Sequence, residues 1–151
     1  MRIVHRIIAT NVILKEMGIA ESYNCSFCDQ EKDSIQHMFW RCIHINEFWK
    51  NLQELIKGKC TIANNLFLNE KLILFGTDDN AVMDTTIDLI ILIAKQYIYS
   101  CKTNKCKPSL TVFLKIVKKR YDLEKYIASV QLNLPKFYIN WNSYEALFDN
   151  C

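Results

Sequence analysis

Four residues with zinc-binding side chains lie within 18 positions near the start of the chain and limit how this segment can fold. Residues 25–42 read C-S-F-C-D-Q-E-K-D-S-I-Q-H-M-F-W-R-C. Structural zinc sites use four Cys or His ligands in a tetrahedron, and a Cys-x-x-Cys turn supplies two of them to one ion. The spacing predicts that Cys25, Cys28, His37 and Cys42 together bind one structural zinc ion, Zn²⁺.

The loop that carries these residues, 23–42, has too few apolar side chains to stabilise itself by burial. Zinc binding supplies on the order of 10 kcal/mol, which becomes folding energy when the site exists only in the folded chain. We therefore expect the metal to hold the loop, with Phe27, Phe39 and Trp40 packed beside it. Four protein ligands leave no open coordination position, so the zinc is predicted to be structural.

Three other interpretations of the cysteines stay open. A thioredoxin-type redox pair needs a helix that starts at the second cysteine, and residues 26–34 lack the apolar residues for one. The cysteines can also be structural thiols that bind no metal. Finally, His44 can replace His37 as the fourth ligand, although its position two residues after Cys42 is awkward for the same ion.

The remainder of the chain has the composition and periodicity of a helical protein. Only three glycines and two prolines occur in 151 residues, and half of the residues are hydrophobic. Apolar residues recur at helical spacing in several segments. The predicted helices cover residues 2–17, 35–40, 45–58, 81–101 and 108–130, whereas 72–75 is predicted to be a short strand or extended segment and 76–80 a turn.

We expect a mostly α fold, in which a small zinc-knuckle unit is followed by a helical C-terminal body. The boundary is predicted near residue 58, which gives a zinc-binding domain at 1–58 and a helical body at 59–151. Pro135 is predicted to break the chain after the last long helix. The aromatic tail, residues 137–148, is expected to dock onto the body.

Basic residues are concentrated in one segment of the sequence. Residues 95–120 carry eight basic side chains and no acid, so the rest of the chain carries −5, because the net charge is +3. Such a local field attracts phosphate groups, and interleaved tyrosines can stack on unpaired bases. The alternative interpretation is that these basic residues lie on an ordinary solvated helix face and bind no nucleic acid. The candidate nucleic-acid-binding residues are Lys95, Lys102, Lys105, Lys107, Lys115, Lys118, Lys119 and Arg120, with Tyr97, Tyr99 and Tyr121 among them.

No catalytic set is visible in the sequence. Asp78 and Asp79 follow Phe75 with one residue more than the F/Y-x-D-D pattern of polymerases allows, and they are interpreted as a solvated turn. A Ser/His/Asp set and a phosphate-binding glycine loop are both missing. We therefore expect no enzymatic activity from the chain by itself and no small-molecule substrate.

The sequence also bears on the cellular compartment. No secretory signal is visible, and the most apolar run, residues 89–94, is too short to span a bilayer. These features predict no membrane association. Free cysteines that bind metal are typical of a reducing compartment, so a nuclear or cytoplasmic location is expected.

The residues around the cysteines resemble a known family. The runs T-N-V-I-L-K-E-M-G-I, C-S-F-C, I-Q-H-M-F-W-R-C and F-W-K-N-L are similar to the zinc-binding, reverse-transcriptase-associated region near the C-terminus of LINE-type (non-LTR) retrotransposon polyproteins. The later runs L-I-L-F-G and I-L-I-A-K-Q-Y-I-Y-S-C-K give weaker support. The positions that match the family pattern are Cys25, Cys28, His37, Phe39, Trp40, Cys42, Phe48 and Trp49.

The resemblance implies a function for a chain that looks like a detached C-terminal piece of such a polyprotein. It implies a non-catalytic module that helps to handle template RNA or target DNA, with the reverse transcriptase body of the same polyprotein as a second partner. One alternative is a zinc-stabilised protein-interaction module that docks on a polymerase or another protein without touching nucleic acid. Another is a truncated fragment without function.

Overall fold

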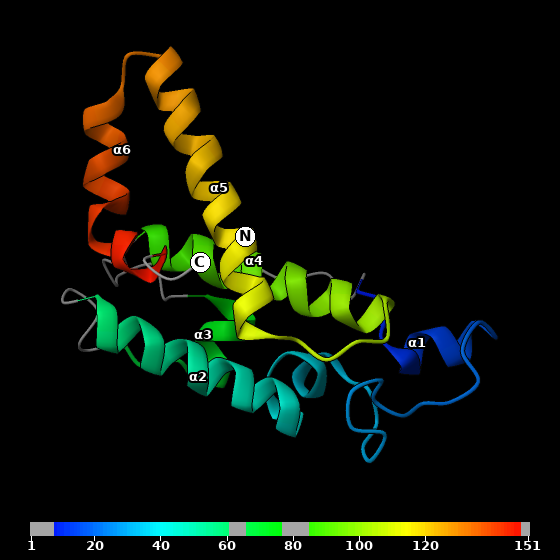
Figure 1. The fold of residues 1–151 in the computed structure, drawn as a ribbon. Helices are drawn as coiled ribbons and strands as arrows, with labels where there is room; N and C mark the ends of the chain where they lie inside the picture. Colours follow the sequence, from blue (N-terminus) through cyan, green and yellow to red (C-terminus); the bar gives the residue numbers. More distant parts are fainter. Residues whose placement is uncertain (1–7, 61–65, 77–84, 149–151) are drawn as a thin grey trace.

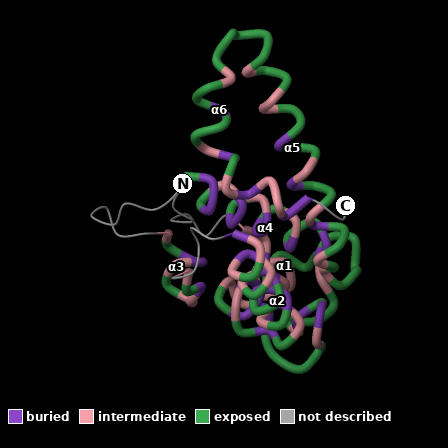
Figure 2. The backbone as a smooth tube through the Cα atoms, turned by 60° about the vertical axis from the view of Figure 1, so that its left-hand side comes forward, coloured by how far each residue is buried: buried purple, intermediate pink, exposed green. Residues whose placement is uncertain are grey.

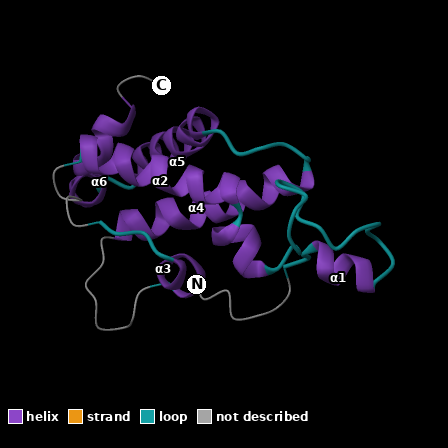
Figure 3. Ribbon diagram, turned by 90° about the horizontal axis from the view of Figure 1, so that it is seen from below, coloured by secondary structure: helices purple, strands orange, loops and turns teal. Residues whose placement is uncertain are grey.

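The computed structural model describes residues 8–60, 66–76 and 85–148 (Figure 1). Within these ranges the chain is built of helices joined by loops, without a β-strand (Figure 3). The predicted mostly α fold, with a Cys/His cluster ahead of a helical body, is confirmed. The elements are α1 (Asn11–Glu16), η1 (His37–Arg41, a π-helical turn), α2 (Ile43–Lys59), α3 (Glu70–Phe75), α4 (Thr85–Thr103), α5 (Leu110–Val130), α6 (Leu134–Trp141) and η3 (Asn142–Phe148, a 3-10 segment).

Helix α1 covers only part of the predicted helix at 2–17, of which residues 2–7 lie outside the described ranges. Thr10 is its N-cap, because its backbone is extended and its side-chain oxygen accepts the N–H of Ile13. At the other end, Gly18 has a φ of 74° and leaves the helix in the left-handed region that glycine tolerates. The helix is therefore short because it is capped on both sides.

The prediction of a strand or extended segment at 72–75 is wrong, because these residues form most of helix α3. Asn69 caps this helix, since its side-chain oxygen accepts the N–H of Leu72 at 2.9 Å. Ile73 and Leu74 are buried in the core. A four-residue apolar run is compatible with either structure, and packing decided it here. The predicted turn over 76–80, including Asp78 and Asp79, lies outside the described residues after Gly76.

The predicted break after the last long helix is present at residues 131–133, between α5 and α6, and Pro135 lies just beyond it. Pro135 lies in the first turn of α6, where the missing N–H of proline costs no intrahelical hydrogen bond. The chain reverses just before it, at Leu132, which has a φ of 54°. The proline therefore begins the second arm of a helical hairpin.

Helix α2 connects the loop of residues 23–42 to the rest of the core. Its apolar side chains recur at helical spacing, and five of them are buried. Trp49 Nε1 donates a 2.7 Å hydrogen bond to the carbonyl of Phe39 in η1. Phe48 contacts Phe113 of α5 edge to face, with ring centroids 5.4 Å apart. The helix runs to Lys59, so Gly58 lies in its last turn instead of ending it.

The aromatic tail docks on α5, as the sequence predicts. Tyr121 of α5 lies within ring contact of Phe137, Trp141 and Phe148, at centroid distances of 5.1, 5.5 and 5.1 Å. Helices α5 and α6 form an antiparallel hairpin whose far end projects away from the other helices (Figure 1). Figure 2 shows that buried residues gather near the base of this hairpin and that its far end is largely exposed.

The two predicted domains share one hydrophobic core. Buried residues from Cys25 to Phe148 belong to a single cluster, to which α2, α4 and α5 all contribute. The predicted boundary at residue 58 falls inside the last turn of α2 and stays a prediction. In the described ranges no helix is both long enough and apolar enough to cross a bilayer.

Candidate metal centre

Backbone hydrogen bonds fold residues 23–42, hereafter the cysteine loop, back on itself. Asn24 and Lys32 form an isolated antiparallel bridge, and the N–H of Cys25 donates to the carbonyl of Glu31 at 2.8 Å. Between them the N–H of Asp29 donates to the carbonyl of Cys25, and Asp29 itself has a φ of 56°. The reversal brings the two thiols of the Cys-x-x-Cys turn to one side of the loop.

The other two ligands come from the ends of the π-helical turn η1. Ser34 precedes this turn, and its hydroxyl accepts the N–H of His37 at 3.1 Å. The N–H of Cys42 donates to the carbonyl of His37 at 2.9 Å. Because this bond joins residues five apart, it closes a wider turn than an α-helix. The wide turn brings the side chains of His37 and Cys42 to the same centre.

The four predicted ligands converge on one point, with their ligand atoms all within 4.8 Å of one another. Cys25 Sγ lies 3.9 Å from Cys42 Sγ, and Cys28 Sγ lies 3.3 Å from His37 Nε2. Zinc bonds of about 2.3 Å to sulfur and 2.0–2.1 Å to nitrogen place the atoms of a tetrahedral shell about 3.5–3.8 Å apart. The donor set and its spacing therefore fit one structural zinc ion.

Glu31 orients the histidine of this cluster. Its Oε2 lies 3.0 Å from His37 Nδ1, on the opposite side of the ring from Cys28. Histidine ligands commonly pair their second ring nitrogen with a carboxylate, which fixes the tautomer and the ring orientation. His37 is thus prepared to bind metal through Nε2. The sequence interpretation missed Glu31, because an exposed acid in a charged loop carries no distinguishing pattern.

The Cys25 thiol donates a hydrogen bond to Cys42 Sγ. Their hydrogen bond raises the pKa of Cys25, with burial adding to the effect, and lowers the pKa of Cys42. Cys25 therefore holds the proton and Cys42 is the acceptor. A zinc ion requires both sulfurs as thiolates, so binding displaces this proton.

Two of the alternatives considered from the sequence, His44 as a ligand and a redox pair, receive no geometric support. His44 is not in the cluster, since it lies in the first turn of α2 and lines a separate cavity of about 220 Å³ with Lys107. Residues 26–28 form a turn, and no helix begins at Cys28 as a thioredoxin-type pair requires.

A buried ion pair attaches the cysteine loop to the C-terminal end of α4. Lys102 Nζ lies 3.0 Å from Asp33 Oδ2, and the two side chains are 5% and 0% exposed. The same ammonium donates to the carbonyl of Ala9 at 2.6 Å, and the N–H of Asn11 donates to Asp33 Oδ2 at 2.7 Å. The cysteine loop, α1 and α4 therefore meet at one charged contact, on the side of the molecule where α1 lies in Figure 1.

The eight basic residues predicted to bind nucleic acid occupy different environments. Lys102 faces inward, and Lys95 is buried on α4, where burial lowers its pKa. Lys118 pairs with Asp122, and Arg120 pairs with Glu124, each one turn apart on α5. The four that are exposed without a recorded ion pair are Lys105, Lys107, Lys115 and Lys119.

The three tyrosines predicted to stack on bases also differ in exposure. Tyr121 is buried, and Tyr97 packs between Phe48 and Phe113. Tyr99 is exposed on α4. Its neighbour Lys102 lies with Nζ 6.0 Å from the ring centroid. Of this set, Tyr99 is the most exposed in the described structure, and Tyr97 is half-buried.

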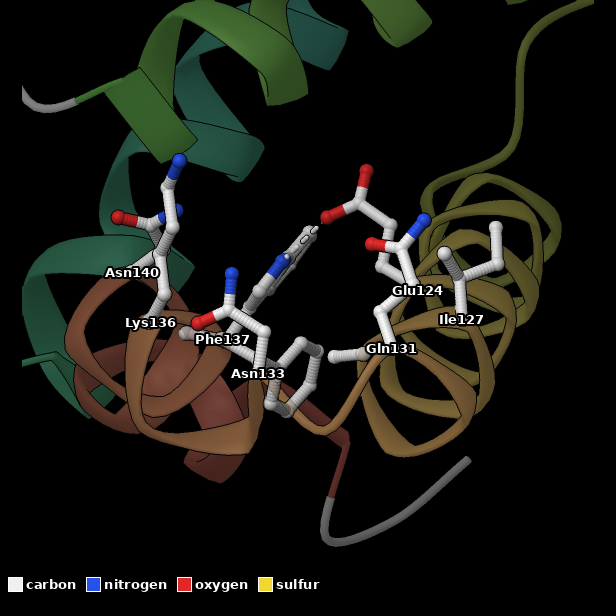
Figure 4. Close-up of a pocket in the computed structure, with 9 residues that line it drawn as sticks. Glu124, Ile127, Gln131, Asn133, Lys136, Phe137 and Asn140 are labelled. Carbon is white, nitrogen blue, oxygen red and sulfur yellow. Dashed lines mark hydrogen bonds between the residues drawn. The ribbon is translucent and has the colours of Figure 1, made fainter.

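A cavity of about 230 Å³ opens between α5 and α6 near the end of the hairpin. Trp141 Nε1 donates to Glu124 Oε2 at 2.7 Å within it. No predicted site residue lines this cavity. Figure 4 shows its rim, which carries side chains from both helices and from the loop between them, namely Glu124, Ile127, Gln131, Asn133, Lys136 and Asn140.

Comparison with known proteins agrees with the metal cluster. Residues 1–49 match the family described as zinc-binding in reverse transcriptase, a range that contains all four ligands and ends within α2. No curated protein matches the chain, and no solved structure matches it. Residues 1–49 of this chain are therefore similar to the zinc-binding region of that family, and their Cys/His cluster fits one structural zinc ion.

Proposed function

We propose that the chain is a non-catalytic module that binds RNA or DNA, in which a structural zinc ion holds the cysteine loop against the helical body. One observation carries the proposal. A cavity of about 570 Å³ lies between α1 with the segment that follows it and the end of α4, and its lining includes Glu21, Ser22, Ser26 from the cysteine loop, Tyr99 and Lys105. An exposed ring and an exposed ammonium beside a zinc-binding region are the groups that bind an unpaired base and its phosphate.

The exposed lysines extend this contact along the chain. Lys105 and Lys107 lie in the connection between α4 and α5, and Lys115 and Lys119 are one turn apart on the exposed side of α5. Phosphate contacts made by such residues are independent of sequence and weaken with salt. The proposed binding is therefore electrostatic in strength and tolerant of sequence.

The proposed role of zinc is to position the loop, not to react. Three thiolates and one imidazole fill a tetrahedral shell, which leaves no site for water or substrate on the metal. Two serines of the cavity wall, Ser22 and Ser26, flank the first zinc ligand, Cys25. Loss of the metal is therefore expected to displace Ser26 from the cavity wall.

The test is an RNA-binding titration with the zinc-loaded chain at several salt concentrations, measured by fluorescence anisotropy with an unstructured oligonucleotide. We expect the slope of log K against log salt to fall by about 0.7 for each phosphate contact removed from a single strand. The variant Lys105→Ala, Lys107→Ala is compared with Lys50→Ala, Lys136→Ala, a pair of exposed lysines on α2 and α6. Equal affinities for these two variants, or binding insensitive to salt, would contradict the proposal.

A further inference from the structure

Helix α5 carries a second apolar stripe on the side that faces away from the core. Its inner side buries Phe113, Val117 and Tyr121. We call this second row of apolar residues the outer stripe, and its side chains are 37–67% exposed. Exposed apolar residues in a contiguous row mark an interaction surface, whereas scattered ones do not. The outer stripe consists of Val112, Ile116, Leu123, Tyr126 and Val130.

The spacing of the outer stripe fits a second helix. With Lys119 included, its positions are separated alternately by four and three residues from 112 to 130. This is the repeat of the a and d positions that form the seam between two helices in a coiled coil. A stripe this narrow has the width of a seam between two helices, whereas binding to a flat protein surface would not require so narrow and regular a stripe.

The charges beside the outer stripe identify the kind of helix. Lys119 lies within the seam and Lys115 flanks it, both without an ion pair in the described structure, whereas Arg120 and Asp122 flank it while paired with Glu124 and Lys118. A parallel second copy would place Lys119 against Lys119 and Lys115 against Arg120. An antiparallel copy centred on the seam would place Arg120 against Arg120 and Asp122 against Asp122. Like charges in these positions oppose pairing, so the stripe selects against its own copy.

The fold leaves the outer stripe open to a partner. The hairpin of α5 and α6 projects from the body, and Figure 2 shows exposed residues along its far half. Helix α6 packs on the inner side of α5, where Tyr121 contacts Phe137 and Trp141. We propose that the outer stripe binds an amphipathic helix of a different protein, with acidic residues placed opposite Lys119 and its basic neighbours.

The inference is tested with a designed helical peptide as the probe. The peptide has Leu at its a and d positions and Glu beside them, and a second peptide has Lys in place of every Glu. Binding to the zinc-loaded full chain is measured by anisotropy of the labelled peptide. We expect the acidic peptide to bind at least tenfold more tightly than the basic one, because only it complements Lys115, Lys119 and Arg120.

Matched variants locate the binding surface. Leu123→Asp places a charge in the seam and is expected to weaken the acidic peptide about tenfold or more. Ile139→Asp makes the same change at a residue of α6 that is 82% exposed and lies outside the outer stripe, and it should leave the affinity unchanged. Circular dichroism and zinc content of both variants report whether they are folded.

Three outcomes would overturn the inference. Equal binding of both peptides would remove the charge argument. Equal effects of Leu123→Asp and Ile139→Asp would place the peptide elsewhere. Self-association in sedimentation velocity that Leu123→Asp abolishes would show that a second copy covers the stripe. The variant Lys105→Ala, Lys107→Ala separates this inference from the proposed function, since it is expected to weaken RNA binding and changes no residue of the outer stripe or of the charges beside it.

Discussion

Breaking the buried contact between Asp33 and Lys102 should release the cysteine loop from the helical body. Lys102→Met keeps most of the apolar stem and removes the ammonium. Asp33 then loses its counter-charge and retains only the N–H of Asn11, while its other oxygen, Oδ1, is already buried without a hydrogen bond in the described structure. The variant leaves an uncompensated carboxylate at 0% exposure.

The geometry sets the expected size of the effect. Two unit charges 3.0 Å apart attract by roughly 5 kcal/mol at an effective dielectric constant of about 20, which desolvation of both groups offsets. Removing one partner of such a pair costs about 3–5 kcal/mol, because the other charge stays buried. Replacing both charges, in Asp33→Asn with Lys102→Met, should cost about 2 kcal/mol less than the sum of the single changes.

The assay is urea unfolding of the zinc-loaded chain for the two single variants and the double variant. The control is Lys105→Met, three residues further on and exposed, which should change the free energy of unfolding by no more than about 0.5 kcal/mol. If the single variants each lose less than about 1 kcal/mol, or if their losses add, the ion pair does not join the loop to α4 and the reasoning fails.

Three further results are expected. Cys28→Ser should abolish the zinc content measured per chain. Glu31→Gln should keep the zinc and weaken zinc affinity about tenfold in a chelator competition, since only the orientation of His37 is lost. Equal zinc content of the Cys28 variant and the parent would refute the assignment of Cys28 as a ligand. Phe113→Ala should cost about 3–5 kcal/mol in urea unfolding because its ring is fully buried, against about 0.5 kcal/mol or less for the exposed Val112→Ala. Lys95→Met should raise stability at pH 7 by about 1 kcal/mol, because burial lowers the pKa of this lysine and its charged form is therefore disfavoured in the folded chain. The gain in stability should shrink as the pH rises from the lowered folded pKa of Lys95 towards the unfolded value of 10.5. A gain that grows with pH would show that folding does not lower the pKa of Lys95.

Local sequence patterns were sufficient for the metal cluster and for helix α2. The ligands Cys25, Cys28, His37 and Cys42 lie close along the chain, so their spacing and chemistry restrict where each side chain can point. The apolar repeat of α2 has one buried side, and the sequence identifies it. Both features depend on interactions within a few turns of chain.

The tertiary structure decided which way the charged and apolar residues of α4 and α5 face. In the sequence, Lys95 and Lys102 belong to one basic segment. Both are buried in the structure, because α4 packs against other elements on several sides and Lys102 pairs with Asp33 from a distant part of the chain. Helix α5 has two apolar stripes, and either has the period of a core-facing side. Only the packing of α2, α6 and the aromatic tail on Phe113 and Tyr121 determines which stripe is inside, and so leaves the outer one exposed.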